Sequence, residues 1–379
     1  MPKRCVTVCG LGDLMLGGPA FSTPKKVAEV DFQPLYHHLD TADVVVANLE
    51  APFDDGSNII LADKIRLWAP PWSADILHKL RVNVVSLANN HIFDCGLAGF
   101  DNTRRVLRKL NVLYCGAGSN IEEARQPACL SFEGVSVDVF GYSWTGEWVK
   151  GPPRAGSDRF GVAPLEPSLV KEDLARSNAD LKILTVHWGE EDTIWPSLDR
   201  RRMSRLLHSW GADVILGHHP HVVQGIERKG RGVTAYSLGN FLFAPQIYEG
   251  GVLRIAGPEG ISQAGETGRQ RLGLLLRLAW TVDVGVSETK PVFVGRAHSD
   301  VLLREHTGYT KRGSWRVYQT LLNSPYPVYG PLFAVLRRID EISLFFSGLS
   351  RVRRVRPRLR HLKSFARLAQ TVVRPPRRL

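Results

Sequence analysis

Polar side chains follow short apolar runs at five places along the chain. The stretch 86–94 (SLANNHIFD) ends one such run with amide, imidazole and carboxylate groups. The polar residues at these five places are Asp13, then Asn48 and Glu50, then Asn90, His91 and Asp94, then His187, and finally His219 and His221. Carboxylate, carboxamide and imidazole groups together bind Mn, Fe or Zn, and two such ions can activate water for hydrolysis.

Each group also has an ordinary structural explanation. Asp13 could cap a turn, Glu50 could be a surface charge, and His187 could be a satisfied buried histidine. The segment His218–His221 could be a solvated turn, although Pro220 would fix the loop between two ligands. Because all five groups follow strand-like runs, their joint occurrence favours a metal site.

The elements that position these groups form an α/β pattern. Strands are predicted at 4–11, 43–47, 82–85, 181–186, 212–216 and 232–236, and further strands at 128–132, 135–142, 271–284 and 291–297. Helices are predicted at 25–39, 97–110, 166–179 and 196–210. In an α/β sheet the carboxyl ends of the strands are where chemistry is placed.

Composition is that of a globular protein. The chain has 379 residues, of which 44% are hydrophobic and 23% charged, and no apolar run of about 18 residues predicts a spanning helix. The first residues show no apolar secretory core, so we expect a cytoplasmic protein. Five cysteines occur without a Cys-x-x-Cys pair, and we expect reduced thiols.

Positive charge is concentrated at the C-terminus. The formal net charge is +12, yet residues 351–379 hold eleven Lys or Arg and no acid, which leaves the preceding residues nearly neutral. Residues 331–349 carry apolar side chains at helical spacing. An amphipathic helix and basic tail predict peripheral contact with an anionic membrane, whereas the alternative is a packed helix with a disordered end. Nucleic acid is disfavoured, because no aromatic stacking platform interleaves the arginines.

Six motifs carry a resemblance to a known family. They are GDLMLGG, ANLEAPF, SLANNHIFDCG, VHWGEE, GHHPHVVQGIE and YSLGNFLF, in this order over about residues 4–300. The series resembles the capsule-biosynthesis CapA family, also called poly-γ-glutamate synthesis proteins, within the calcineurin-like metallophosphoesterase superfamily. The resemblance implies a four-layer α/β/β/α sandwich with two mixed sheets face to face and helices outside.

The resemblance also implies roles for individual residues. The implied metal ligands are Asp13, Glu50, Asn90, His187, His219 and His221, which would hold two divalent ions (Mn, Fe or Zn). His91 would face the leaving-group oxygen, with Asp94 as the second catalytic residue. Asn48, Trp188, Glu190 and Asn240 would support the ligands or face the substrate. The chain departs from the superfamily at Met15, where an imidazole is usual.

Two functions follow from these features. The first is a metal-dependent hydrolase that cleaves a phosphoester or amide bond of an anionic polymer or phosphoester in capsule or poly-γ-glutamate biosynthesis. The second is a non-catalytic, membrane-associated assembly factor that contacts capsule-synthase components. We expect a metallophosphoesterase-like domain at 1–300, a helical extension at 301–350 and the basic tail at 351–379.

Truncation after Gly348 tests the basic tail. The remaining body should stay folded and metal-loaded but lose binding to anionic liposomes, because the charge that attracts them lies in 351–379. Liposome co-sedimentation of the full chain should weaken steeply with salt. Neutral liposomes are the control, and aggregation of the truncated body would instead show that the removed residues cover part of the core.

Overall fold

The computed structural model describes residues 4–305, apart from 19–20, 59–65, 145–152, 244–246, 250–251, 255–271 and 297–302. All of them belong to the first of two units into which the chain divides, Met1–Tyr329. The second unit, Gly330–Leu379, lies outside the described residues, and so do the predicted helix at 331–349 and the tail at 351–379. The boundaries predicted after residues 300 and 350 stay predictions.

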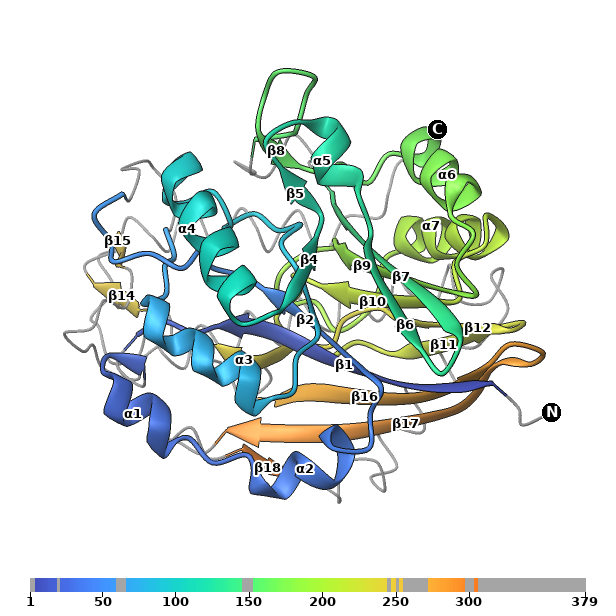
Figure 1. The fold of residues 1–379 in the computed structure, drawn as a ribbon, viewed down its shortest axis with the longest axis horizontal. Helices are drawn as coiled ribbons and strands as arrows, with labels where there is room; N and C mark the ends of the chain where they lie inside the picture. The colour runs from blue at the N-terminus through green and yellow to red at the C-terminus, as the bar shows by residue number, and fades with distance from the viewer. Residues whose placement is uncertain are drawn as a thin grey trace, which may run out of the picture. The chain divides into compact units, whose positions relative to one another are not determined.

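Two mixed β-sheets form the body of this unit (Figure 1). The first sheet has the order β18 (Leu303–Glu305), β17 (Gly285–Arg296), β16 (Leu272–Thr281), β1 (Cys5–Met15), β2 (Val44–Leu49), β3 (Val84–Ser86) and β4 (Leu113–Cys115), with β13 (Asn240–Phe243) paired to β1. The second has the order β11 (Ile226–Lys229), β12 (Gly232–Ala235), β10 (Val214–His218), β9 (Leu181–His187), β7 (Val135–Ser143) and β6 (Ala128–Phe132). Two small pairs lie apart, β5 (Ala117–Gly118) with β8 (Gly161–Val162) and β14 (Ile247–Glu249) with β15 (Val252–Arg254).

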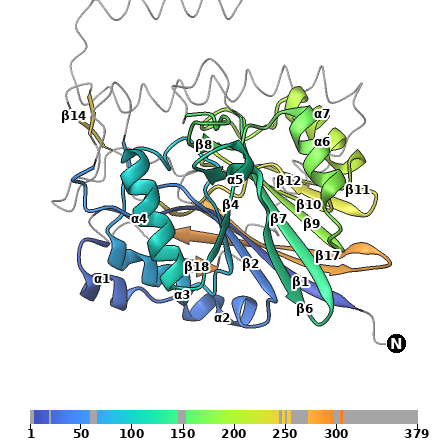
Figure 2. The ribbon, with the colours of Figure 1, turned by 45° about the horizontal axis from the view of Figure 1, so that its top comes forward.

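Helices cover the outer faces of the two sheets (Figures 1 and 2). The helices are α1 (Pro24–Glu29), α2 (Gln33–Leu39), the 3₁₀ turn η2 (Pro71–Ala74), α3 (Asp75–Lys79), α4 (Gly96–Lys109), α5 (Ile121–Arg125), α6 (Pro167–Arg176) and α7 (Leu198–Ser209). None of the helices in the described part of the chain is long and apolar enough to cross a membrane. All five cysteines are free, as predicted.

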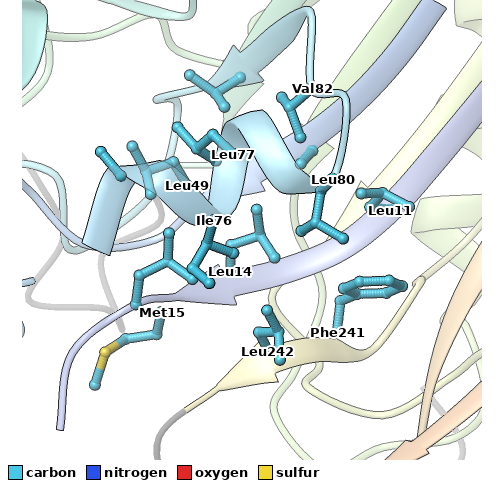
Figure 3. Packing of buried hydrophobic residues seen from close by; sticks show 14 of the residues in the cluster. Leu11, Leu14, Met15, Leu49, Ile76, Leu77, Leu80, Val82, Phe241 and Leu242 are labelled. Carbon is cyan, nitrogen blue, oxygen red and sulfur yellow. The ribbon is translucent and has the colours of Figure 1, made fainter. Parts of the chain in front are cut away.

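Side-chain alternation along the strands separates two apolar cores. Val8 and Val46 point between the sheets, where they share a core with Ile183 and Leu216 of the second sheet. The neighbouring residue Val45 belongs to the other core, between the first sheet and its helices, and Figure 3 shows part of that core around α3. Two sheets face to face with helices outside confirm the predicted four-layer α/β/β/α sandwich.

The prediction of one continuous helix at 25–39 is wrong, because the chain forms two helices there. Val30 adopts an extended conformation after α1, and the Asp31 carboxylate accepts a hydrogen bond from the Gln33 N–H at 2.8 Å. Pro34 then occupies the first turn of α2, where its missing N–H costs nothing. The apolar spacing is helical across the break, so periodicity alone did not reveal it.

The strand ends meet because the SLGNF segment joins the two sheets. The Leu238 N–H donates to the Gly217 carbonyl of the second sheet at 3.0 Å, and the Gly239 carbonyl accepts from the Asp13 N–H of the first at 2.8 Å. In the register, Asp13 lies opposite Asn48 on one side and Asn240 on the other. The polar ends of both sheets therefore face one another.

Gly12 is expected to be essential to this junction. A Cβ atom there would lie 2.1 Å from the Gly239 carbonyl oxygen, so Gly12→Ala must push the two segments apart. We expect a loss of about 1–3 kcal/mol in the free energy of unfolding, measured by denaturant titration. Gly156→Ala is the control, since its Cβ would meet nothing closer than 3.6 Å; equal losses in both variants would contradict the account.

Candidate metal centre

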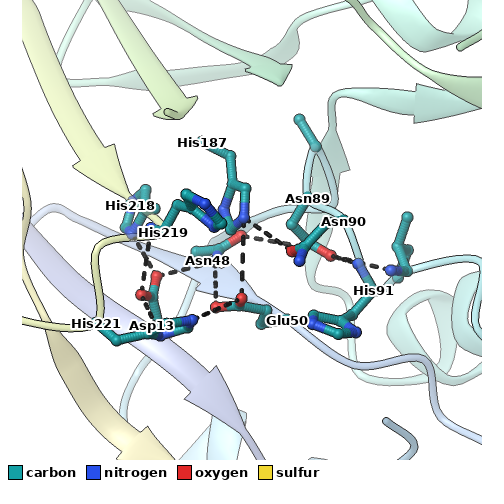
Figure 4. A network of polar contacts seen from close by, with 12 residues as sticks. Asp13, Asn48, Glu50, Asn89, Asn90, His91, His187, His218, His219 and His221 are labelled. Carbon is teal, nitrogen blue, oxygen red and sulfur yellow. Dashed lines mark hydrogen bonds and ion pairs between the residues drawn. The ribbon is translucent and has the colours of Figure 1, made fainter. Parts of the chain in front are cut away.

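Asp13 lies at one end of a buried polar network at the strand ends (Figure 4). Its side chain is fully buried, and its Oδ1 accepts a hydrogen bond from Asn48 Nδ2 and contacts His218 Nδ1, each at 2.9 Å. Its Oδ2 lies 3.5 Å from His221 Nδ1. Both carboxylate oxygens of Asp13 therefore have protein partners.

Glu50 occupies the middle of the network (Figure 4). It is fully buried, its Oε2 accepts from Asn48 Nδ2 at 3.3 Å, and its Oε1 has no hydrogen-bond partner. Oε1 lies 3.5 Å from His221 Nε2 and 3.8 Å from His187 Nε2. Ligand atoms of Glu50, His219 and His221 all lie within 4.8 Å of one another, which is compatible with one bound ion.

His187 and Asn90 complete the Glu50 side of the network. His187 ends β9 and lies opposite His218 of β10 in the parallel register, so both imidazoles emerge at the same sheet edge. His187 Nε2 contacts the Asn90 Oδ1 at 2.9 Å, while its Nδ1 is buried without a hydrogen-bond partner. The predicted ligands from the two sheets therefore come together, Asp13 at one end and Asn90 at the other.

The His219-Pro220-His221 turn holds its imidazoles in a strained backbone. His219 has a φ of 96° and His221 a φ of 57°, and residues other than glycine rarely adopt such positive φ values. Such strain costs on the order of 1–3 kcal/mol per residue and is typical of functional sites. Both rings are buried, so the alternative of a solvated turn is wrong.

The two carboxylates respond to burial in different ways. Burial raises the pKa of Glu50 well above its usual value. Burial also acts to raise the pKa of Asp13, but hydrogen bonds from His218 and His221 outweigh it and hold that pKa below the usual range. Asp13 is therefore ionised, whereas the attraction of Glu50 to His221 does not outweigh the effect of its burial.

The pKa values of the buried imidazoles also shift in different directions. Burial lowers the pKa of His187 and lowers that of His219 to about 4, so both are neutral and can offer a lone pair. Burial acts to lower the pKa of His221 too, but the Glu50 and Asp13 carboxylates raise it to about 10. Because a cation must displace the proton of His221, its affinity for the centre should rise with pH.

His91 lies on the far side of Glu50 from Asp13 and forms a chain of contacts of its own (Figure 4). Its Nδ1 lies 2.6 Å from Asp94 Oδ2, and Asp94 Oδ1 pairs with Arg66 Nη1 at 3.0 Å. The Leu67 N–H donates to Asp94 Oδ2 at 2.7 Å. Asp94 thus fixes the His91 ring and leaves Nε2 as the atom available for proton transfer.

The remaining predicted residues divide by exposure. Asn48 bridges Asp13 and Glu50, and the Asn240 Oδ1 contacts His221 Nδ1 at 2.9 Å. Trp188 is buried and donates its indole N–H to the Tyr236 carbonyl at 2.9 Å, so it supports the strand ends without facing solvent. Glu190 is exposed.

Met15 does not replace the missing imidazole. Its side chain is buried among Leu14, Ile76 and Leu242 in the core beneath the helices (Figure 3), and its Sδ accepts from the Gly17 N–H at 3.1 Å. His218 instead supplies an imidazole to Asp13. The chain therefore keeps the core methionine away from the polar network.

Three residues of the network were not predicted. His218 is revealed by its register with His187, and Asn89 is buried, with its Nδ2 donating to Asn48 Oδ1 at 3.1 Å. Arg66 lies at the end of a long Pro- and Asp-rich loop where no strand pattern points to it. Of these, only the doubled Asn and doubled His in the sequence offered a signal.

The residues present fit a divalent ion on the Glu50 side. A buried carboxylate oxygen without a hydrogen-bond partner is costly unless a proton or cation stabilises it. The Nδ1 atoms of His187 and His219 are likewise buried without partners. Oxygen and imidazole donors of this kind suit Mn, Fe or Zn.

Comparison with known proteins identifies the family. The model of the bacterial capsule synthesis protein family PGA_cap matches residues 7–245. The chain belongs to this family. Capsule biosynthesis protein CapA of Bacillus anthracis is 30% identical over 248 residues, covering 63% of this chain and 60% of that protein. PGA biosynthesis protein CapA of Bacillus subtilis (strain 168) is 32% identical over 241 residues, covering 62% of each.

A less similar protein and a solved structure also match the chain. A probable polyglutamine synthesis accessory protein of Mycobacterium tuberculosis (strain ATCC 25618 / H37Rv) is 28% identical over 197 residues, covering 49% of this chain and 51% of that protein. A phosphatase from Mycoplasma pneumoniae has a TM-score of 0.47 at 15% identity, covering 83% of this chain and 99% of that one. The chain spans less than two thirds of the length of each of the two CapA relatives.

Two buried carboxylates give a matched test of the candidate metal centre. Glu50→Gln should lower metal affinity by about 100-fold or more without destabilising the metal-free protein, because Oε1 has no hydrogen-bond donor to lose. Metal content by mass spectrometry and denaturant titration measure the two effects.

Asp54→Asn is the control. Asp54 is equally buried, but its oxygens accept from the Gly56 N–H at 2.8 Å and from Asn58 Nδ2 at 3.0 Å. This variant should lose about 1–3 kcal/mol of stability and keep its metal. The reverse pattern, a destabilised Glu50→Gln that still binds metal, would contradict the assignment.

Proposed function

We propose that this chain is a metal-dependent hydrolase that acts in capsule or poly-γ-glutamate biosynthesis, on a phosphoester or amide bond of an anionic substrate. The observation that carries the proposal is the Asp94-bound His91 beside the Glu50 cluster. A proton donor and a set of metal ligands at one sheet edge are the two parts that metal-assisted hydrolysis needs.

The proposed ligands divide between the two ends of the network. Glu50, Asn90, His187, His219 and His221 would hold an ion on the Glu50 side, and Asp13 would take part in a second site once His218 or His221 releases it. A bound divalent ion supplies Lewis-acid polarisation and lowers the pKa of water. Ion number and identity (Mn, Fe or Zn) are part of the proposal.

His91 serves as the proton donor in this proposal. Its Nδ1 is fixed by Asp94, so its Nε2 would protonate the leaving-group oxygen or nitrogen. Arg66 and the Leu67 N–H each bind one oxygen of Asp94, which holds the carboxylate and the imidazole in one orientation. Asn89 shapes the same loop by accepting from the His91 N–H at 3.1 Å.

A second candidate is a non-catalytic assembly factor. Met15 favours it, because an apolar core residue stands where the superfamily usually has an imidazole. The Mycobacterium tuberculosis relative is called an accessory protein. In this role the domain would contact capsule-synthase components and would lie in the cytoplasm, with the basic tail on an anionic membrane surface.

Hydrolysis by metal-loaded protein separates the two candidates. We expect turnover of at least one substrate in a panel of phosphoesters and γ-glutamyl polymers, with loss on chelation. His91→Ala should retain its metal and lose about 10²–10⁴-fold in kcat, because it removes proton transfer and not a ligand.

Arg66→Gln should lower kcat by about tenfold and keep the metal, since the Asp94 carboxylate keeps its bond from the Leu67 N–H. Arg105→Gln is the control, because its exposed guanidinium contacts Asn102 on α4. Loss of the metal in His91→Ala would show that the division between proton donor and metal ligands is wrong. Absence of turnover with every substrate would favour the assembly-factor candidate.

A further inference from the structure

Trp144 and Arg200 form a cation–aromatic pair outside the polar network described above. The Arg200 guanidinium carbon lies 4.0 Å from the centre of the Trp144 ring. Trp144 directly follows β7 and leaves 36% of its surface exposed. Arg200 lies in the first turn of α7, where its backbone N–H donates to the capping Ser197 hydroxyl at 3.4 Å.

The pair is attached to the candidate metal centre through the backbone. The Trp144 N–H donates to the His187 carbonyl at 2.9 Å, so the backbone of Trp144 lies beside the end of β9, which carries a predicted ligand. The segment leading into α7 is held against the histidine turn, because the Asp192 N–H donates to the Pro220 carbonyl at 2.9 Å. Both members of the pair therefore belong to segments that border the centre.

Arg200 has no carboxylate partner in the part of the chain that the structure describes. Its Nε is buried without a hydrogen bond, and Trp144 is its one ring contact. Asp199 and Glu190 are the acidic groups that influence it, and neither forms an ion pair with it among the described residues. Burial also lowers the pKa of Arg200, which reflects the cost of holding this charge without a counterion.

The two arginines that follow Arg200 on α7 both have carboxylate partners. Arg201 is buried and pairs with Glu227 at 3.1 Å, and Arg202 is exposed and pairs with Asp199 at 3.2 Å. A half-buried guanidinium packed on an aromatic ring keeps N–H groups available for two oxygens of a carboxylate or phosphate.

We propose that Trp144 and Arg200 form a subsite for an oxyanion group of the substrate, a carboxylate or a phosphate, at the border of the candidate metal centre. The subsite rests on the proposed function, since it binds a second part of the same substrate. Arg200 would pair with the oxyanion through its terminal nitrogens, while Trp144 fixes the plane of the guanidinium and offers an apolar face to the substrate backbone.

Calorimetric titration of the full metal-loaded chain tests the subsite with two probes, a γ-linked glutamate trimer and inorganic phosphate. Arg200→Gln should weaken binding of one of them by about tenfold, the usual effect of losing a charged hydrogen bond. Arg200→Lys should recover part of the loss, and Trp144→Leu should weaken binding with the fold intact by circular dichroism. Dependence on the trimer alone identifies a carboxylate, and dependence on phosphate alone identifies a phosphate.

Arg202→Gln is the matched control, because it removes one positive charge from the same helix and should change neither affinity by more than about twofold. Equal losses in Arg200→Gln and Arg202→Gln would overturn the proposal, since general attraction by the basic chain explains them. No measurable binding of either probe at millimolar concentration would also overturn it. Metal content of the same samples keeps this failure distinct from that of the proposed function, which fails when the wild-type chain holds no metal.

Discussion

The burial of two carboxylates, Asp13 and Glu50, determines which groups the rest of the strand-end network must supply. Asp13 and Glu50 are both fully inaccessible, and among the described residues only imidazole and amide groups contact them. Burying a carboxylate without a counterion is costly, so a native fold keeps such a pair only where protons or cations stabilise it. Asp13 obtains that stabilisation from His218 and His221, and Glu50 is the group left for a metal ion.

Much of this arrangement could be predicted from the sequence. Polar residues follow strands in the one-dimensional pattern, and parallel register then forces Asp13, Asn48 and Asn240 to lie side by side. The apolar run at 43–47 predicted a buried strand, and β2 is buried on both faces, as expected inside a layered sandwich. Family membership over residues 7–245 agrees with the motifs that suggested it.

Other features depend on contacts that no local pattern encodes. The break between α1 and α2 follows from the Asp31 hydrogen bond and Pro34, which interrupt an otherwise helical spacing. Arg66 reaches Asp94 from 28 residues away along the chain, and Trp144 meets Arg200 across two segments of the second sheet's border. Such pairs become visible only when the chain has folded, because sequence separation says nothing of side-chain contact.

Anomalous X-ray diffraction from crystals of the protein purified without chelator tests the central claim most directly. Data collected on both sides of the Mn, Fe and Zn absorption edges identify the metal and count the ions. The account predicts an anomalous peak bounded by Glu50, His219 and His221, with Glu50 Oε1 as a ligand. Absence of any peak after soaking with each metal, with Glu50 Oε1 hydrogen-bonded to a neighbouring side chain instead, would contradict it.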